Sequence, residues 1–411
     1  MFGIARRRIV ATIAMAGALA IGGGCADGPG GSGGGGGGEG VETAPSSPPK
    51  LPDQPVTLNV LDVAGNLQLT KAAIEKYQKE NPKAAQRITF STATAPELAG
   101  KVKAQQNAGR LNIDLVLTGT DGLAAGMSQG LWLKGLPDME GLDAPYLAPA
   151  AKMQEQAEGQ GVLVNYYPSG PLLEYAPDRV SEPPTTPQAL LAWAKDNPGK
   201  FMYARPSNSG PARTFLMGLP YLLGDKDPRD PINGWDKTWA YLKELGKHVE
   251  YYPSGTKDTM SGLADGSRDI IPTTTGWDIN PRALGTVPKG VKVAAFDDLR
   301  WVTDAHYMVV PKGIAEDKLA VVADLMKYLL EPEQQAFAYD DGYFYPGPAI
   351  EGVGLDMAPE KSQKVIEEFG RPEYDELIES RPKETPLLGK PLVDAFDKWD
   401  REVGGSKVKE D

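Results

Sequence analysis

The stretch DGSRDIIPTTTGWDIN at residues 265–280 has the same layout as AGRLNIDLVLTGTDGL at residues 108–123. Each segment passes from an expected helix end through a glycine to an aspartate that opens a short apolar strand, and then reaches threonines and Gly-x-Asp. In open α/β sheets, ligands bind at the carboxyl ends of the strands. Two units of this build therefore predict two α/β lobes that each present a polar loop to a shared cleft.

The composition fits a soluble globular protein with more than one domain. The chain has 411 residues, of which 41% are hydrophobic and 24% charged, and this length is enough for two buried cores. The net charge of −12 gives no electrostatic attraction to nucleic acid. Two histidines and one cysteine leave no intramolecular disulfide and no site built on several histidines. We therefore expect a monomer without nucleic acid, metal or cofactor.

The first 24 residues predict an export signal. Arg6, Arg7 and Arg8 form a positive start. Residues 9–21 then form an apolar segment that is too short to span a bilayer as a stable helix. We therefore expect the mature protein to lie outside the cytoplasm.

Cys25, the only cysteine, follows this signal directly. A glycine-rich run and then a Pro/Ser-rich stretch fill residues 25–55, which predicts a flexible tether. This order of signal, cysteine and tether resembles a bacterial lipoprotein, in which the cysteine carries the lipid that anchors the protein to the cell membrane. Gly22 stands where that pattern usually has leucine, and the alternative is free secretion after cleavage near residues 18–20.

Strands and helices alternate in the part of the chain that follows, which predicts a parallel sheet covered by helices. Strands are expected at residues 56–61, 87–91 and 114–117, with an amphipathic helix between each pair. The polar loops after these strands are candidate ligand-binding segments. Their candidate side chains are Asn66, Thr120 and Asp121.

The second lobe carries two recognisable helix starts. Thr186 followed by Pro187 predicts a helix with Thr186 as its N-cap. After an expected strand at residues 201–204, a serine-rich loop opens a long apolar helix, where free backbone N–H groups and the helix dipole favour an anion. The alternative is N-capping by one of the serines, which needs no ligand. The candidate residues here are Ser207, Asn208, Ser209, Gly210 and Arg213.

Four motifs in this order resemble extracellular solute-binding proteins of bacterial ABC importers, the group that includes the spermidine/putrescine, iron and thiamine binders. They are YARPSNSGPARTFL (203–216), GWDINPR (276–282), WVTDAHYMVVPKG (301–313) and LLEPEQQA (329–336). The resemblance covers nearly the whole chain from Val56 onward. It implies a receptor that binds one small solute without altering it and delivers it to an ABC permease and its ATPase.

The resemblance also implies a fold and its domain boundaries. The fold would be α/β, two-lobed and periplasmic-binding-protein-like (type II), with the ligand cleft between the lobes. Lobe 1 would span residues 56–161 and lobe 2 residues 162–303. Residues 304–411 would return to lobe 1 and add C-terminal helices on both lobes. The strands that cross between the lobes would fall near residues 162–167 and 301–310.

In polyamine binders, by the same resemblance, an aromatic ring and an acid late in the chain hold the amine. Trp277 and Asp278 occupy one corresponding place here, and Asp304 or else His306 occupies the other. Tyr345 is a further candidate. A tryptophan face attracts an ammonium group by about 1–2 kcal/mol when water is excluded. Because the serine-rich loop favours an anion instead, a polyamine-like and a zwitterionic solute both remain open. Packing of Trp277 in the core, with Asp278 as a cap, is the alternative.

Two other classes of protein compete with a solute receptor. A secreted hydrolase for a small ester or glycan would use paired acids in a large cleft. The chain has no GxSxG nucleophile elbow at the exit of an expected strand, however, and neither histidine has an evident nucleophile beside it in the sequence. A surface interaction or adhesion lipoprotein is the third reading. We expect a receptor and not an enzyme.

Overall fold

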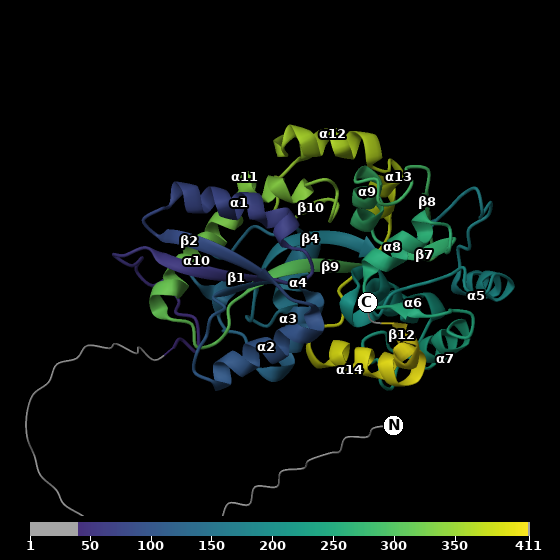
Figure 1. The fold of residues 1–411 in the computed structure, drawn as a ribbon, viewed down its shortest axis with the longest axis horizontal. Coiled ribbons are helices and arrows are strands. Elements are labelled where there is room, and N and C mark those ends of the chain that lie inside the picture. The colour runs from purple at the N-terminus through teal and green to yellow at the C-terminus, as the bar shows by residue number, and fades with distance from the viewer. Residues whose placement is uncertain (1–39, 410–411) are drawn as a thin grey trace, which may run out of the picture. The chain divides into compact units, whose positions relative to one another are not determined.

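The computed structural model describes residues 40–409 (Figure 1). The predicted export signal, Cys25 and the glycine-rich run lie outside the described residues. The later part of the predicted tether is packed on the protein. The Val41 N–H donates to the Ile314 carbonyl at 2.8 Å, and the Ala44 N–H donates to the Lys134 carbonyl at 2.8 Å. Both side chains also contact the core, so the prediction of a free tether through residue 55 is wrong for this segment.

The first lobe is built on a mixed sheet with the strand order β10-β4-β9-β3-β1-β2. β1 (Val56–Asp62) pairs in parallel with β2 (Ala85–Thr92) and β3 (Leu115–Gly119), as the alternation of strands and helices predicted. Helices cover this sheet, and each buries an apolar face, as Ala73 and Tyr77 do at a spacing of four residues. The helices are α1 (Leu67–Glu80), α2 (Ala95–Asn107), α3 (Thr120–Gln129) and α4 (Ala148–Gln156).

Two long central strands connect the lobes. β4 (Val162–Gly170) and β9 (Trp301–Val309) are antiparallel neighbours, and every residue of both strands is buried. β9 also pairs with β3 of the first lobe. β4 continues into β5 (Leu172–Tyr175), which belongs to a separate sheet. The crossing segments expected near residues 162–167 and 301–310 therefore coincide with two strands that reach from one sheet towards the other.

The second lobe has a small antiparallel sheet with the order β7-β5-β8. Thr186 accepts a hydrogen bond from the Ala189 N–H and Pro187 opens α5, which confirms that predicted start. The expected strand at residues 201–204 is wrong, because only Phe201 makes a bridge, to Ile270. The elements are β7 (Ile270–Thr273), β8 (Lys292–Ala295), α5 (Pro187–Asp196), α6 (Gly210–Leu223), α7 (Asp236–Leu245), α8 (Thr256–Ala264) and α9 (Thr275–Ala283).

The C-terminal part contacts both lobes. α10 (Glu316–Leu329) packs on α1 and β1 of the first lobe. α14 (Gly389–Trp399) packs on α3, whereas Trp399 at its end donates to the Tyr203 hydroxyl at 3.1 Å in the core of the second lobe. The remaining elements are short: β6 (Tyr252–Pro253), β10 (Gly347–Pro348), β11 (Lys383–Glu384), β12 (Val408–Lys409), α11 (Pro332–Gln335), α12 (Glu360–Phe369) and α13 (Glu373–Ser380).

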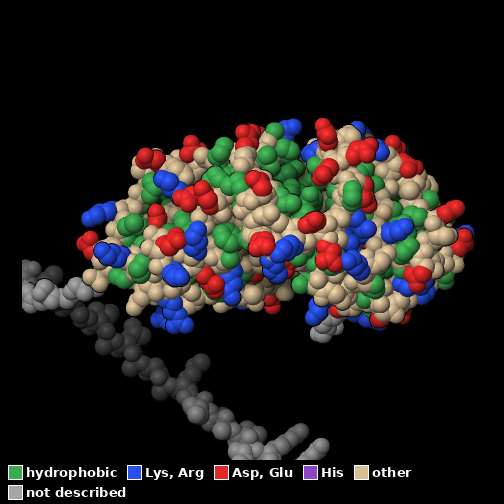
Figure 2. Space-filling model, turned by 90° about the horizontal axis from the view of Figure 1, so that it is seen from above, with side chains coloured by type: hydrophobic (Ala, Val, Ile, Leu, Met, Phe, Trp, Pro, Cys, Tyr) green, Lys and Arg blue, Asp and Glu red, His purple; other side chains and the backbone are tan. Residues whose placement is uncertain are grey.

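The surface is mixed in charge on the face that Figure 2 shows, where acidic and basic side chains are interspersed and hydrophobic side chains gather near the middle. The net charge of −12 is therefore not concentrated on this face. Within residues 40–409, no helix combines the length and the apolar character needed to cross a membrane.

Candidate functional site

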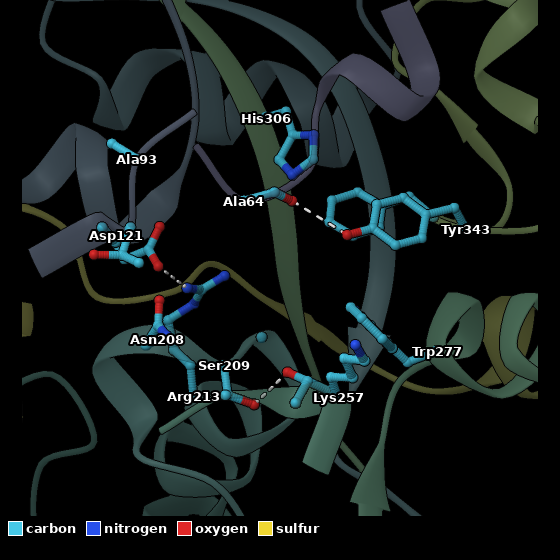
Figure 3. Close-up of a pocket in the computed structure, with 16 residues that line it drawn as sticks. Ala64, Ala93, Asp121, Asn208, Ser209, Arg213, Lys257, Trp277, His306 and Tyr343 are labelled. Atoms are coloured by element: carbon cyan, nitrogen blue, oxygen red, sulfur yellow. Dashed lines mark hydrogen bonds and ion pairs between the residues drawn. The ribbon is translucent and has the colours of Figure 1, made fainter. Parts of the chain in front are cut away.

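A cavity of about 280 Å³ lies where segments of both lobes meet. Its volume is close to the lower end of the range for small-molecule sites, about 300–1,000 Å³. Figure 3 shows polar side chains on one side of it and aromatic rings on the other. The lining residues are Ala64, Ala93, Thr94, Ala95, Asp121, Asn208, Ser209, Gly210, Arg213, Gly255, Thr256, Lys257, Trp277, His306, Tyr343 and Phe344.

The polar side is formed by the N-termini of α6 and α8, which are joined to each other by hydrogen bonds. Ser209 caps α6 by accepting from the Ala212 N–H at 3.3 Å, and its hydroxyl lies 2.7 Å from that of Thr256, the first residue of α8. The Asn208 amide donates to the Ser254 carbonyl at 3.1 Å, which ties the same two segments. Two helix N-termini therefore face one cavity, and such ends attract acceptor oxygens and anions.

Arg213 forms the floor of the polar side and bridges both lobes. Its Nη1 lies 2.9 Å from Asp121 Oδ2 on α3, and its Nη2 donates to Asp304 on β9. Asp304 also accepts from the Thr120 hydroxyl at 2.6 Å and from the Tyr167 hydroxyl at 3.1 Å. Burial lowers the pKa of Arg213, but the two carboxylates outweigh it, so the pKa stands above its ordinary value. The guanidinium charge is therefore already matched within the protein.

Aromatic rings make the opposite side. Trp277 on α9 lies with its ring centroid 5.4 Å from that of Tyr343, and Tyr343 is stacked on Phe344 at 5.0 Å. The Tyr343 hydroxyl donates to the Ala64 carbonyl at 3.3 Å, which fixes the ring against the loop after β1. A solute in this cavity would therefore meet a flat apolar surface opposite the helix N-termini.

His306 on β9 is the one histidine on the cavity wall. Its side chain is 1% exposed, its ring lies 4.2 Å from Phe344, and neither ring nitrogen has a hydrogen-bond partner among the described residues. Burial lowers its pKa to about 3, although Asp304 raises it. The imidazole is therefore uncharged near neutral pH, and it offers one donor and one acceptor.

The structure brings half of the predicted site residues onto the cavity wall. These are Asp121, Asn208, Ser209, Gly210, Arg213 and Trp277. Asp304 lies beneath the floor and accepts from Arg213, and the Thr120 hydroxyl donates to Asp304. Of the two readings left open for β9, His306 lines the cavity and Asp304 does not. Contact of any of these residues with a ligand stays a prediction.

Besides Thr120 and Asp304, four predicted residues do not line this cavity, and their placement there is corrected. Asn66 is buried at the start of α1, where its amide donates to Asn165 at 3.4 Å and its oxygen accepts from Thr70 at 2.8 Å. The Ser207 hydroxyl is buried without a partner among the described residues, beside a neighbouring cavity. Tyr345 packs with apolar residues of the second lobe, including Leu172. Asp278 is the fourth.

Asp278 points away from the cavity into a sealed cluster of charges. It is 0% exposed and accepts from Arg282 at 3.0 Å, from Arg371 at 2.6 Å and from the Tyr374 hydroxyl at 2.8 Å. The sequence stretch was read as a loop, but it forms α9. Consecutive residues of a helix point about 100° apart, so Trp277 reaches the cavity and its neighbour Asp278 cannot.

Several lining residues were missed in the sequence, among them Thr256, Lys257 and Phe344. The run Ser254-Gly255-Thr256 after a short strand was a usable signal, because it resembles the helix start at Ser207–Gly210. The pairing of those two starts in space could not be read from the chain, since 46 residues separate the partners Asn208 and Ser254.

A model of the family described as bacterial extracellular solute-binding protein matches residues 72–365. The chain belongs to this family. All four motifs quoted for the resemblance lie within the matched range. No curated protein matches the chain.

Solved structures show that this solute-binding protein has the two-lobed fold of periplasmic binding proteins. The spermidine/putrescine ABC transporter substrate-binding protein PotD from Streptococcus pneumoniae is 14% identical, with 84% of this chain and 99% of that chain covered and a TM-score of 0.54. A periplasmic thiamin binding protein is 14% identical, with 86% and 99% covered and a TM-score of 0.59. AfuA from Actinobacillus pleuropneumoniae, with fructose-6-phosphate bound, is 15% identical, with 84% and 98% covered and a TM-score of 0.59. The predicted fold class is confirmed.

Proposed function

We propose that this solute-binding protein is the extracytoplasmic receptor of an ABC importer, which captures one small polar organic solute between its lobes and delivers it to a permease and its ATPase. The observation that carries the proposal is the cavity of about 280 Å³ whose wall combines Asp121 of the first lobe with the α6 and α8 starts of the second. A solute held there contacts both lobes at once, so its binding energy can favour the closed arrangement.

The solute of this proposal carries an acidic group, either alone or in a zwitterion. A polyamine needs carboxylates that are free to pair with ammonium groups. Asp278 is already paired with Arg282 and Arg371, and Asp121 is already paired with Arg213. The helix N-termini and Lys257 on the same wall favour negative charge. AfuA, which shares the fold, holds a solute with an acidic group, fructose-6-phosphate.

Hydrolysis of the solute is not part of this proposal. The acids at the cavity are paired with Arg213, whereas a glycosidase needs one carboxylic acid and one free carboxylate across the scissile bond. His306 has no hydrogen-bonded nucleophile among the described residues. We propose capture without chemistry.

A lipid on Cys25 is the proposed anchor, and it would place the receptor at the outer face of the cell membrane. The order of export signal, cysteine and glycine-rich run supports it. Mass spectrometry of the mature N-terminus would show a diacylglyceryl group on Cys25. An unmodified N-terminus near residue 20 would show secretion instead.

Calorimetry with the full chain tests the receptor function. Candidate solutes are titrated, the heat of binding is measured, and the solute is recovered afterwards. A receptor binds a solute with a stoichiometry of one and returns it unchanged, and Trp277→Ala weakens the binding. Recovery of a cleaved product would support the hydrolase, and failure of every solute class to bind would support the adhesion protein.

A further inference from the structure

The joined N-termini of α6 and α8 present unused hydrogen-bond donors to the cavity. No described residue accepts from the backbone N–H of Gly210, of Thr256 or of Lys257. The Lys257 side chain is exposed at the cavity rim and makes no ion pair with another described residue. Three amides and one ammonium group thus lie on one wall without a protein acceptor.

The other helix starts at the cavity are already compensated. The Thr94 N–H at the start of α2 donates to the Glu97 carboxylate at 3.0 Å. Asp121 in the first turn of α3 accepts from the Gly122 N–H at 2.9 Å. Asp258 in the first turn of α8 compensates that helix start in part. The first turn of α6 holds no acid, so the unmatched positive potential is concentrated at the start of α6 and at Lys257.

A second observation points independently to a ligand. His306 is buried on the cavity wall with both ring nitrogens unpartnered among the described residues, and the Nε of Arg213 is likewise buried and unpartnered. In Figure 3 both side chains border the same cavity. A buried polar group without a hydrogen-bond partner destabilises the protein. A ligand that brings the missing partners removes this destabilisation.

The number of unmatched donors indicates the kind of acid. The wall offers the backbone N–H groups of Gly210, Thr256 and Lys257 and the Lys257 ammonium group. The Arg213 cluster adds no positive charge, because two carboxylates, Asp121 and Asp304, pair with its one guanidinium. A phosphate monoester brings three acceptor oxygens to these donors, whereas a carboxylate brings two.

We infer that the solute carries a phosphate or phosphonate group, which binds at the joined N-termini of α6 and α8 beside Lys257. The organic part then lies against Trp277 and Tyr343, and His306 meets an uncharged donor or acceptor on it, such as a hydroxyl or an amide. This inference rests on the proposed receptor function and names its class of solute.

The test compares probes that share one ring and differ in the charged group. Phenyl phosphate, phenylphosphonate, benzoate, benzylamine and inorganic phosphate are titrated into the full chain by calorimetry at pH 7.5. At least one of the first two is expected to bind about tenfold or more tightly than benzoate, which corresponds to about 1.4 kcal/mol. If phenyl phosphate binds more tightly than phenylphosphonate, the natural solute is a phosphate ester; if phenylphosphonate binds more tightly, it is a phosphonate.

Ser209→Asp supplies the decisive variant. Aspartate is as good an N-cap as serine, so α6 keeps its start, but the added carboxylate occupies the anion position. We expect phenyl phosphate binding to be lost in Ser209→Asp, and to fall much less in Ser209→Asn, which has nearly the same size as the aspartate variant but no charge. Lys257→Ala should weaken binding about tenfold, and the exposed Lys195→Ala on α5 should leave it unchanged, without risk to the fold in either case.

Each outcome separates the two proposals. Three results would each overturn the phosphate class. The first is equal affinity for benzoate and phenyl phosphate, and the second is unchanged binding in both Ser209→Asp and Lys257→Ala. The third is that neither inorganic phosphate nor any other phosphate probe binds. If benzylamine or benzoate then binds in the cavity, as judged by Trp277→Ala, the receptor function stands without it. Release of phenol from phenyl phosphate would overturn the receptor function itself.

Discussion

Two buried clusters of arginine and aspartate among the described residues differ in their surroundings, one around Asp278 and one around Arg213. Around Asp278, two arginines and a tyrosine hydroxyl all donate to one carboxylate, and the group is sealed from solvent. Around Arg213, two carboxylates pair with one guanidinium, but the cluster borders a cavity where His306 has no hydrogen-bond partner among the described residues. Paired charges therefore organise both clusters, whereas a ligand can use only the unmatched donors beside the Arg213 cluster.

The largest expected effect comes from breaking the sealed cluster. Asp278→Ala leaves Arg282 and Arg371 buried without their carboxylate, and loss of one partner from a buried ion pair costs about 3–5 kcal/mol. We expect the free energy of unfolding in urea to fall by that amount. The fraction that remains folded should still bind phenyl phosphate, because Asp278 does not line the cavity.

Glu174→Gln is the matched control in the same cluster. Glu174 is fully buried, and burial followed by the charge of Asp278 raises its pKa well above the ordinary range. Because a raised pKa favours the uncharged carboxyl, its replacement by the amide of the same shape should change stability much less than Asp278→Ala does. A loss as large as that of Asp278→Ala would show that Glu174 is ionised and that the description of the cluster is wrong.

His306, which lies beside the Arg213 cluster, predicts a loss of stability in acid. The pKa of His306 is about 3 in the folded protein, and its unfolded value is about 6.5. Because only the unfolded state takes up the proton between these values, stability is complete above pH 6.5 and falls as the pH drops toward 3. The expected loss from this residue between pH 7 and pH 5 is about 2 kcal/mol.

His306→Phe should remove this part of the pH dependence when unfolding is measured from pH 7 to pH 5. Asp304 and Arg213, the charged groups that act on the imidazole, stay in place in the variant. Asp62 has the opposite sign, because burial raises its pKa to about 6, so its protonation favours the folded state as the pH falls. An identical pH profile in His306→Phe and the parent would show that the imidazole is hydrated and titrates normally.

The sequence predicted the fold well and the site in part, for physical reasons. Strands, helix caps and the order of family-like motifs are local signals, so the Thr186 cap and the crossing strands were found. The site depended on helical phase and on distant pairing. Trp277 and Asp278 were assigned to one wall because α9 was read as a loop, and Lys257 was overlooked because only the fold brings α8 beside α6.

Trp277 is the sequence neighbour of Asp278, but it lines the cavity and Asp278 lies in the sealed cluster. Trp277→Ala removes the half-buried ring from the cavity wall but leaves the sealed cluster intact. Aromatic contacts are worth about 0.5–1.5 kcal/mol beyond the area they bury, so we expect the affinity for phenyl phosphate to fall about tenfold in calorimetry. Trp193→Ala on α5 is the control for loss of a tryptophan, and an equal fall in both variants would remove Trp277 from the site.

The two serines of the loop before α6 give the smallest and cleanest contrast. Ser209 caps α6 and bonds Thr256, so Ser209→Ala should cost about 1 kcal/mol of unfolding free energy. The Ser207 hydroxyl is buried without a partner among the described residues, and removal of an unmet polar group is nearly neutral or stabilising. Ser207→Ala should therefore leave both stability and phenyl phosphate affinity unchanged in parallel urea unfolding and calorimetry. A loss of affinity in Ser207→Ala would mean that the ligand-binding cavity extends past the start of α6 and includes Ser207 as well as Ser209.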